Sequence, residues 1–201
     1  MDRNIEAYNK IAKSFDEGRS LTLMEKSYLE LFLQYIPDHG SVLDLGCGTG
    51  RPILQFLRNY RLQIMACDAS EKMLDLAKKH FPDQEFILQD MRNINFEKEY
   101  FDGIIAWHSL FHLTKEDQQK VIKNLATQLK VGGILLFTSG NANEERLGNN
   151  YGERLFHASF APSEYRSILL ACGFRILLHS IEDPHCGFAT IWVALKDAHK
   201  A

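Results

Sequence analysis

The apolar positions near the start of the chain recur at helical intervals, in two separate runs. They are Ile5, Tyr8, Ile11, Ala12 and Phe15, then Leu21, Met24, Tyr28, Leu31, Phe32 and Tyr35. Pro37 follows the second run and cannot continue a helix. The spacing therefore predicts two helices between residues 3 and 36.

Short apolar runs then alternate with amphipathic stretches. The apolar runs, which we expect to be strands, are SVLDLG, RLQIMACD, EFILQD, FDGIIAW and GGILLFTSG. Helical patterns begin near Arg51, Glu71 and Lys115. Strict alternation of strand and helix favours βαβ units and a parallel sheet.

The helix near Lys115 has the clearest start. Thr114 is placed to cap its free amides, and Asp117 three residues later completes a capping-box pattern. Its apolar face is Val121, Ile122, Leu125 and Leu129, and we expect Gly132 and Gly133 to end it.

The last third of the chain has a different pattern. Residues 141–160 are polar and lack a clear period, which predicts a functional loop over the sheet. A helix is expected after Pro162, with Gly173 as its stop. FRILLHSI and GFATIWVAL follow with only EDPHC between them. Parallel neighbours need a crossover of about a dozen residues, so these two strands should be antiparallel.

These elements predict a doubly wound α/β fold, with a mostly parallel sheet and a reversed final strand. We expect one domain over residues 1–201, with a helical cap at 1–37 and a Rossmann-like core at 38–201. Composition agrees, because 45% hydrophobic and 24% charged residues are close to the average of globular domains.

The charge, the cysteines and the apolar runs indicate which partners and which compartment to expect. A net charge of -3 gives no broad attraction to nucleic acid. The four cysteines form no CxxC pair and are expected to be reduced thiols. No apolar stretch approaches the roughly 20 residues that span a bilayer. We expect a cytoplasmic protein with no membrane partner, either a monomer or a homodimer.

The most informative segment is VLDLGCGTG, residues 42–50. An apolar strand runs directly into Gly46, Gly48 and Gly50, which let the backbone turn tightly and approach a ligand. Asp68 ends the next strand, where an acid can bind both hydroxyls of a ribose. The alternative for the glycines is a plain strand-to-helix turn. The alternative for Asp68 is an acid that interacts favourably with the dipole of the next helix. Asp90, after a third strand, is either an adenine contact or a turn residue.

The loop does not fit a dinucleotide. A GxGxxG motif would place its third glycine where this chain has Arg51, followed by Pro52. Asp44 would also lie awkwardly near a pyrophosphate, whereas it suits a ligand that carries an ammonium group and a positively charged sulfur.

VLDLGCGTG resembles the first motif of the class I S-adenosylmethionine-dependent methyltransferases, and the resemblance covers nearly the whole chain. It implies a seven-stranded sheet of order 3214576, and S-adenosylmethionine as cofactor with S-adenosylhomocysteine as product. By position, the implied cofactor contacts are Asp44, Gly46, Cys47, Gly48, Gly50, Asp68, Ala69, Met73, Asp90, Met91, Trp107 and His108. YNKIAKSFDE is similar to the leading helix of small-molecule enzymes of the ubiquinone-biosynthesis-like kind, type 11, where it covers the cofactor.

FDGIIAWHSLFHL suggests the acceptor side. His108 follows the fourth strand and is a candidate general base, with His112 as a second polar group or base. Alignment alone can supply most of the chemistry of methyl transfer, so neither histidine need be essential. The expected acceptor wall also includes Tyr8, Phe15, Trp107 and, from the long loop, Tyr151 and His157. His157, Asp183 and His185 lack metal-ligand spacing, so we predict no metal site.

These observations favour transfer of a methyl group to a small-molecule acceptor, achieved mainly by proximity. No motif typical of nucleic-acid base methylation follows the fourth strand. Two alternatives stay open: a non-catalytic module that binds the cofactor as a sensor or partner subunit, and an NAD-dependent reductase, which Arg51 and the antiparallel ending disfavour.

Overall fold

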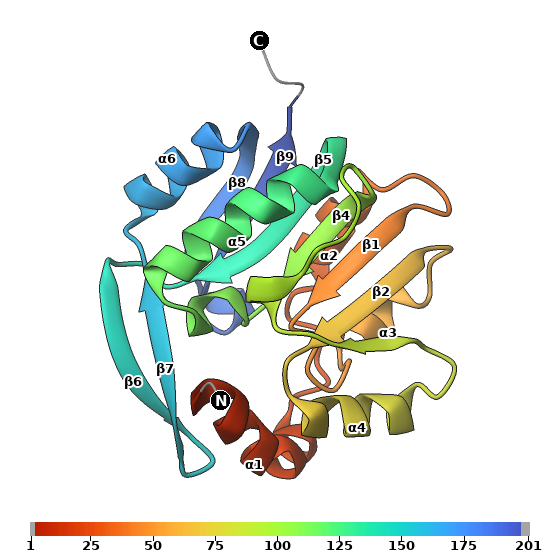
Figure 1. Cartoon of the computed structure of the whole chain (residues 1–201), viewed down its shortest axis with the longest axis vertical. Coiled ribbons are helices and arrows are strands. Elements are labelled where there is room, and N and C mark those ends of the chain that lie inside the picture. The colour runs from red at the N-terminus through yellow and green to blue at the C-terminus, as the bar shows by residue number, and fades with distance from the viewer. Residues whose placement is uncertain (1–2, 198–201) are drawn as a thin grey trace.

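The computed structural model describes residues 3–197, which form an α/β fold around one central sheet (Figure 1). The helices are α1 (Arg3–Gly18), α2 (Lys26–Leu33), α3 (Ile53–Leu57), α4 (Glu71–His80), α5 (Lys115–Gln128) and α6 (Pro162–Ala171), with single 3-10 turns η1 (Met91–Asn93), η2 (Leu110–His112) and η3 (Pro184–Cys186). The strands are β1 (Ser41–Leu45), β2 (Gln63–Asp68), β3 (Phe86–Leu88), β4 (Phe101–Ala106), β5 (Leu129–Ser139), β6 (Glu144–Asn150), β7 (Glu153–Ser159), β8 (Phe174–Asp183) and β9 (Ala189–Lys196).

The sheet confirms the predicted topology. Its seven strands lie in the order β3-β2-β1-β4-β5-β9-β8. Numbered among themselves along the chain, these strands give the order 3214576. The pairs from β3 to β5 are parallel, and β9 is antiparallel to both β5 and β8.

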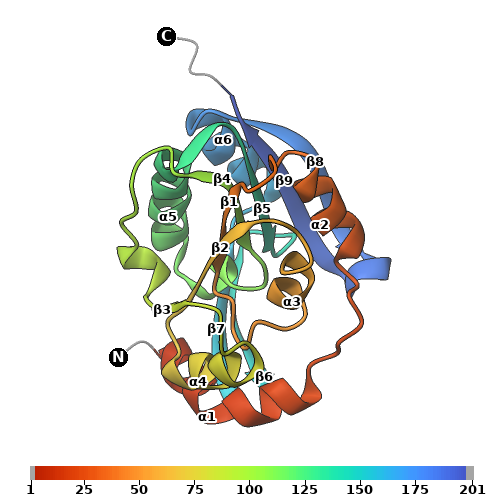
Figure 2. The ribbon, with the colours of Figure 1, turned by 90° about the vertical axis from the view of Figure 1, so that its right-hand side faces the viewer.

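Alternate residues of each central strand face opposite layers. In β1, Leu43 and Leu45 pack with α5, whereas Val42 packs with α2 and α3. The same alternation in β4 sends Ile104 to the first layer and Ile105 to the second. Figure 2 shows α5 on one side of the sheet, with α2 and α3 on the other. Burial on both faces explains why these strands are continuous apolar runs.

The chain order reverses between β1 and β4, which are neighbours in the sheet. Open α/β sheets bind ligands at such a switch point, outside the carboxyl ends of the strands. Helix α1 lies across this edge and contacts α4 and β7, so it is positioned to cover a ligand there (Figure 1).

The prediction of an irregular loop at residues 141–160 was wrong. Strands β6 and β7 form an antiparallel hairpin that lies beside α1, apart from the main sheet (Figure 1). Its two connecting residues, Tyr151 and Gly152, have φ of 48° and 87°. Positive φ at both positions matches the right-handed twist of a hairpin. The sequence hid these strands because nearly all of β6 is exposed, so no apolar alternation marks it.

Two helix boundaries also differ from expectation. The second helix begins at Lys26, which leaves Leu21 and Met24 in an exposed connecting segment. Thr114 is the N-cap residue of α5, as predicted, and its hydroxyl accepts the Asp117 N–H at 3.2 Å. The helix ends at Gln128, however, and Leu129 already belongs to β5.

Within residues 3–197, no helix is both long and apolar enough to cross a bilayer. All four cysteines are unpaired. The same part of the chain holds no group of three His, Cys, Asp or Glu side chains suited to a metal ion.

Candidate active site

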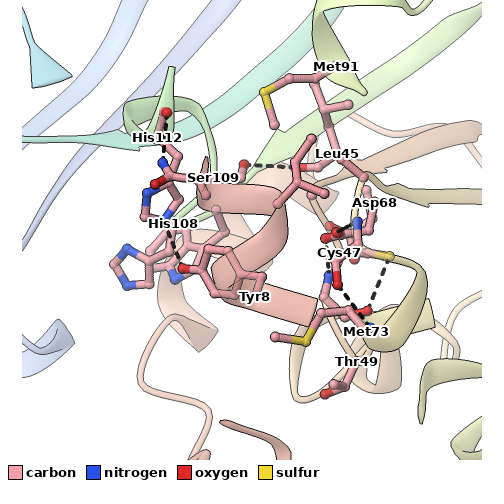
Figure 3. Close-up of a pocket in the computed structure, with 18 of the residues that line it drawn as sticks. Tyr8, Leu45, Cys47, Thr49, Asp68, Met73, Met91, His108, Ser109 and His112 are labelled. Atoms are coloured by element: carbon pink, nitrogen blue, oxygen red, sulfur yellow. Dashed lines mark hydrogen bonds between the residues drawn. The ribbon is translucent and has the colours of Figure 1, made fainter. Parts of the chain in front are cut away.

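A cavity of about 160 Å³ opens at the carboxyl ends of β1, β2 and β4, beneath α1 (Figure 3). It brings together fourteen of the predicted site residues. They are Tyr8, Phe15, Asp44, Gly46, Cys47, Gly48, Asp68, Ala69, Met73, Asp90, Met91, Trp107, His108 and His112.

Three predicted residues do not line this cavity. Gly50 lies behind the loop, where an added Cβ would be 2.8 Å from the Phe81 ring. Tyr151 is half-exposed at the hairpin tip. His157 lies one layer out, with its ring stacked on Phe111 and 4.7 Å from the His112 ring. Both residues were expected in the acceptor wall, but the hairpin places Tyr151 at its tip and His157 against Phe111 and His112 instead.

The cavity also contains residues that the sequence did not single out. They are Asn4, Ile5, Arg19, Leu45, Thr49, Arg51, Ile53, Ser70, Gln89, Arg92, Ser109 and Leu113. The residues next to the glycine loop or at the strand ends could have been predicted, because the motifs already mark those positions. Asn4 and Arg19 carried no sequence signal, because only the docking of α1 brings them to the site.

The glycine loop and Asp68 lie side by side. The N–H groups of Gly46 and Cys47 both donate to the carbonyl oxygen of Cys67, at 2.8 and 3.0 Å. The Gly48 N–H donates to Oδ2 of Asp68 at 2.8 Å. The parallel pairing of β1 and β2 thus sets the loop against the acid at the end of the next strand.

Gly46 meets two requirements that only glycine satisfies. Its φ is +78°, a left-handed conformation that disfavours a side chain. A Cβ built there would lie 2.4 Å from the Cβ of Ser109. The Ser109 hydroxyl in turn donates to the carbonyl oxygen of Leu45 at 2.8 Å. The loop after β4 therefore presses directly on the glycine loop after β1.

Asp68 is partly buried, and its carboxylate already accepts hydrogen bonds from the backbone. Oδ1 accepts the Ser70 N–H at 2.8 Å and Oδ2 accepts that of Gly48. An ionised carboxylate offers about four acceptor positions, so each oxygen can take a further bond from a ligand. Burial raises the pKa of Asp68, and the backbone N–H groups oppose this shift. Both expected roles, orienting the next helix and facing a ligand, are compatible with this geometry.

Asp44 is a buried acid that faces the cavity. It is 3% exposed, and no hydrogen bond to its carboxylate is found among residues 3–197. Burial raises the pKa of Asp44 to about 7, with a further contribution from the negative charge of Asp68 and an opposing one from Arg19. An uncompensated carboxylate in such surroundings attracts a cationic ligand.

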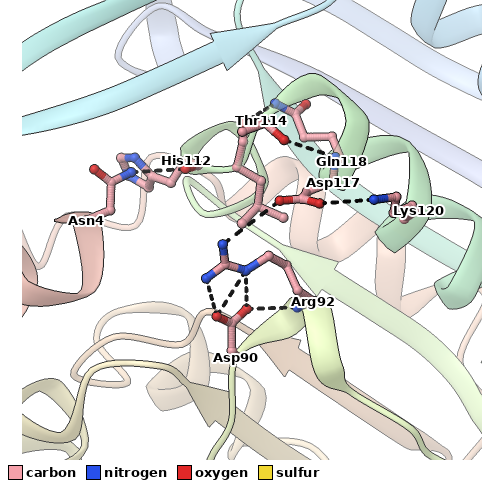
Figure 4. Close-up of polar contacts among 9 residues, drawn as sticks. Asn4, Asp90, Arg92, His112, Thr114, Asp117, Gln118 and Lys120 are labelled. Atoms are coloured by element: carbon pink, nitrogen blue, oxygen red, sulfur yellow. Dashed lines mark hydrogen bonds and ion pairs between the residues drawn. The ribbon is translucent and has the colours of Figure 1, made fainter. Parts of the chain in front are cut away.

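Asp90 has a partner in its own turn (Figure 4). The Arg92 side chain binds both carboxylate oxygens of Asp90, with Nε at 3.0 Å from each. Burial alone would raise the pKa of Asp90, but its bonds from Arg92 outweigh that effect and lower the pKa. Asp90 is thus ionised and oriented, and Arg92 takes up part of its capacity to bind a ligand.

His108 projects into the cavity from the turn after β4 (Figure 3). Its backbone has φ of 50°, and its N–H donates to Oγ1 of Thr138 at 2.8 Å. By accessible surface His108 is exposed, because its ring faces the open cavity. The protein around that cavity, with a smaller effect of the Arg19 charge, lowers the pKa of His108 to about 4. A lowered pKa favours the neutral imidazole and makes it a weaker base.

Tyr8 and His112 form a hydrogen-bonded pair on the same side of the cavity as His108 (Figure 3). Nδ1 of His112 lies 3.0 Å from the carbonyl oxygen of Phe156, which can only accept, so Nδ1 carries the proton. Nε2 of the neutral ring is then the acceptor for the Tyr8 hydroxyl, at 2.8 Å. Burial, followed by the charge of Asp68, raises the pKa of the Tyr8 phenol.

Asn4 fixes this side of the cavity. Its side-chain amide donates to the carbonyl oxygens of His112 and Phe156, at 3.0 and 2.9 Å, and its oxygen accepts the Phe156 N–H at 2.8 Å. One residue of α1 thereby ties the helix to both η2 and β7 (Figure 4 shows its contact with His112).

The sequence profile of a family described as "Methyltransferase domain" matches residues 42–133. Among curated proteins, the demethylmenaquinone methyltransferase of Thermotoga maritima is 32% identical over 137 residues, which are 67% of this chain and 57% of that protein. The cypemycin N-terminal methyltransferase of a Streptomyces species is 32% identical over 134 residues, 64% of this chain and 51% of that protein. The matches thus cover little more than half the length of these relatives.

Among solved structures, the 1,6-didemethyltoxoflavin-N1-methyltransferase of Burkholderia thailandensis has the same fold, with a TM-score of 0.70 at 20% identity over 96% of this chain and 85% of that one. That structure contains its acceptor and S-adenosylhomocysteine. The strand order, the matched domain and the relatives agree. The chain is therefore similar to the class I S-adenosylmethionine-dependent methyltransferases, and residues 42–133 carry the match to the methyltransferase domain.

Proposed function

We propose that this chain transfers the methyl group of S-adenosylmethionine to a small-molecule acceptor bound beneath α1. The observation that carries the proposal is the 2.8 Å contact between the Gly48 N–H and Asp68, at the rim of an open cavity. An adenosyl group needs a bent loop and a carboxylate together, with unfilled space between them and the adjoining wall.

The cavity divides into parts that suit the parts of this cofactor. Asp68 is placed for the ribose hydroxyls, Ala69 and Met73 border the space for adenine, and Asp90 with the Met91 backbone lies where the adenine amino group would be. The polar contacts are supported by position in the cavity and by hydrogen-bonding capacity, and those of Ala69 and Met73 by position and apolar character.

The methionine end of the cofactor suits the charged residues near β1. Asp44 offers a carboxylate to the ammonium group and the sulfonium, and the Gly46–Gly48 loop lies next to it. Arg19, on the segment after α1, is the natural partner for the cofactor's carboxylate, since guanidinium groups bind carboxylates in a two-bond geometry.

When bound, the cofactor would supply an activated methyl group: the acceptor lone pair would bond to the methyl carbon, and the electrons of the carbon–sulfur bond would leave with S-adenosylhomocysteine. The work left to the protein is to align the acceptor and to exclude water, and alignment alone is worth roughly 7 to 11 kcal/mol. The lowered pKa of His108 makes it a poor base, and both ring nitrogens of His112 already make hydrogen bonds. Both observations support a protein that aligns the acceptor without removing its proton. We assign both histidines to the acceptor wall, with Tyr8, Phe15 and Trp107, instead of to obligate proton removal.

The quinone and peptide named for the two curated relatives show that this family serves varied acceptors. Here the space beside the cofactor region is enclosed by α1, the η2 turn and Trp107, which favours a small molecule or a single side chain over a folded partner.

Ligand-dependent unfolding tests the cofactor. S-adenosylmethionine at about a hundred times its dissociation constant should stabilise the fold by roughly 2.7 kcal/mol. NADH is the comparison ligand, and stabilisation by NADH alone would refute the proposal. Labelled methyl donor is then incubated with metabolite extracts. Transfer of label supports an enzyme, and cofactor binding without any transfer would favour the sensor alternative.

A further inference from the structure

A second, smaller cavity adjoins the proposed cofactor site on the side of the segment that joins α1 to α2. Three of its lining residues, Arg19, Trp107 and His108, also line the large cavity, so they form the partition between the two. Its volume is about 50 Å³, which holds a few non-hydrogen atoms. A substituent of a bound molecule fits there, and a whole cofactor does not.

Glu25 gives this cavity its chemical character. Its side chain is 4% exposed and lines the cavity. It occupies the N-cap position of α2, but its side chain accepts no hydrogen bond from the first turn of that helix. Its nearest cation is Arg19, whose guanidinium nitrogen is 3.9 Å away, beyond hydrogen-bond distance. The position of Glu25 in the helix therefore does not account for burying its charge.

Two groups partly compensate the charge of Glu25, because its own backbone N–H and the Arg19 guanidinium both act to lower its pKa. Arg19 also donates from Nε to the Arg51 carbonyl oxygen at 3.3 Å, and its guanidinium lies over the Phe15 ring, so it leans toward the large cavity. Burial raises the pKa of the Cys186 thiol to about 11, with Glu25 contributing, so this group is neutral. Burial is the main reason that the pKa of Glu25 itself is raised.

The walls next to Glu25 suit a compact group with an apolar stem. Trp107 is buried and lies against the Tyr28 ring, with centroids 6.3 Å apart, and presents an aromatic surface at the partition. Met24 forms the outer wall and is 46% exposed. Aromatic faces attract cations, and the methionine side chain adapts to an alkyl stem.

We propose that the second cavity is a subsite for an amino group of the methyl acceptor, with the Glu25 carboxylate as its partner. The proposal rests on the function proposed above, because the subsite opens beside the place where the methyl group is transferred. An ammonium or amine N–H gives the buried carboxylate a charge-assisted bond. An apolar group would leave the carboxylate with no cation closer than Arg19 at 3.9 Å, and an anion would be repelled.

The test compares three small probes of similar size on protein saturated with S-adenosylhomocysteine: propylamine, propan-1-ol and propionate. We expect the dissociation constant of propylamine, measured by titration calorimetry or ligand-observed NMR, to be at least about tenfold lower than that of propan-1-ol. Glu25→Gln should remove this preference. Glu30→Gln, which changes an exposed acid on the same helix, should retain it. Equal binding of the amine and the alcohol, tighter binding of propionate, or a preference that survives in Glu25→Gln would overturn the proposal.

A second variant guards against misfolding of Glu25→Gln. Met24→Trp enlarges a partly exposed wall residue and should block propylamine while the affinity for S-adenosylhomocysteine is unchanged. Undiminished propylamine binding in this variant would place the amine elsewhere. Binding of S-adenosylhomocysteine is measured first in every case. Its absence counts against the proposed function, whereas its presence without amine preference counts against the subsite alone.

Discussion

The two ends of the main cavity are built in different ways. At the glycine loop, the contacts join backbone and side chains on neighbouring strands, such as Gly48 and Asp68, which are 20 residues apart. At the acceptor wall, side chains of α1 reach η2 and β7. Tyr8 and His112 are 104 residues apart, and Asn4 and Phe156 are 152 apart.

The different origin of these contacts indicates that the glycine-loop end of the cavity is the more rigid one. The glycine loop is held by the register of a buried parallel sheet, so its geometry is present whenever the sheet is folded. The acceptor wall exists only when α1 and the hairpin are docked, through part-buried hydrogen bonds of Asn4 and Tyr8 and through buried apolar residues of α1 such as Ile11. Segments of this kind open at lower free-energy cost than the core, which suits a cover that must admit ligands.

The largest expected effect is at the rigid end. Gly46→Ala introduces both a strained φ and a Cβ that meets Ser109, so we expect a loss of roughly 2 to 5 kcal/mol in the free energy of unfolding. Urea denaturation measures it. Gly132→Ala is the matched control, because Gly132 also has positive φ, +81°, but an added Cβ meets nothing within 4 Å. Its cost should be only about 1 to 2 kcal/mol, and equal losses in the two variants would show that the contact with Ser109 is unimportant.

Asp68→Ala tests whether the same end binds the cofactor. Removing the carboxylate leaves the Gly48 N–H and the ligand hydroxyls without partners, and should weaken S-adenosylhomocysteine binding by about 1 to 3 kcal/mol. Calorimetric titration gives the affinity. Asp83→Ala removes an exposed acid, which pairs with Arg58, and should leave the affinity unchanged. Unaltered binding in Asp68→Ala would remove this residue from the site.

The pKa of Asp44 predicts a pH dependence at the boundary of the two ends. A cationic ligand prefers the ionised carboxylate, so with a pKa of about 7 the affinity for S-adenosylmethionine should fall about tenfold between pH 8 and pH 6. Asp44→Asn should bind more weakly at pH 8 and should lose the component of the pH dependence that Asp44 contributes. An identical pH profile in the variant would assign the titration to another group.

The raised pKa of Asp44 also makes the stability of the ligand-free protein depend on pH. The pKa of Asp44 is higher in the folded than in the unfolded chain, so the folded state binds the proton more tightly. The contribution of Asp44 to stability is therefore fully present below its unfolded pKa and is lost as the pH rises through about 7. Asp44→Asn should remove this component from the free energy of unfolding measured between pH 5 and pH 8.

The smallest effect is expected at the acceptor wall. Tyr8→Phe deletes one hydrogen bond to His112 and should cost about 1 kcal/mol of stability. If the wall positions the acceptor, the Michaelis constant or turnover for the acceptor should change more than the affinity for S-adenosylhomocysteine. Tyr35→Phe, at a partly exposed tyrosine, serves as the control. A Tyr8→Phe variant that lost cofactor affinity and kept its acceptor kinetics would reverse the assignment of the two ends.

The elements of the sheet were predictable because their signals are local. Buried parallel strands are continuous apolar runs, and Thr114 and Pro162 mark helix starts by their own chemistry. The hairpin was not predictable in this way. Strand β6 is exposed, so its pairing depends on the turn at Tyr151 and Gly152 and on packing of β7 against α1. Leu129 was wrongly assigned to the helix for a related reason. An apolar residue that follows a helix can equally be the first residue of a strand, and Leu129 begins β5.

The cofactor end followed from sequence because strands in parallel register bring their carboxyl ends to one edge, whatever the rest of the fold does. VLDLGCGTG and Asp68 therefore specified a loop, an acid and their proximity. Tertiary structure alone decided that Asn4 and Arg19 reach the cavity, that His157 and Tyr151 do not line it, and that Glu25 is buried beside it. The physical reason is that these side chains are positioned by how helices and a hairpin pack over the sheet edge. That packing depends on many weak contacts between residues distant in the chain, and no local pattern encodes it.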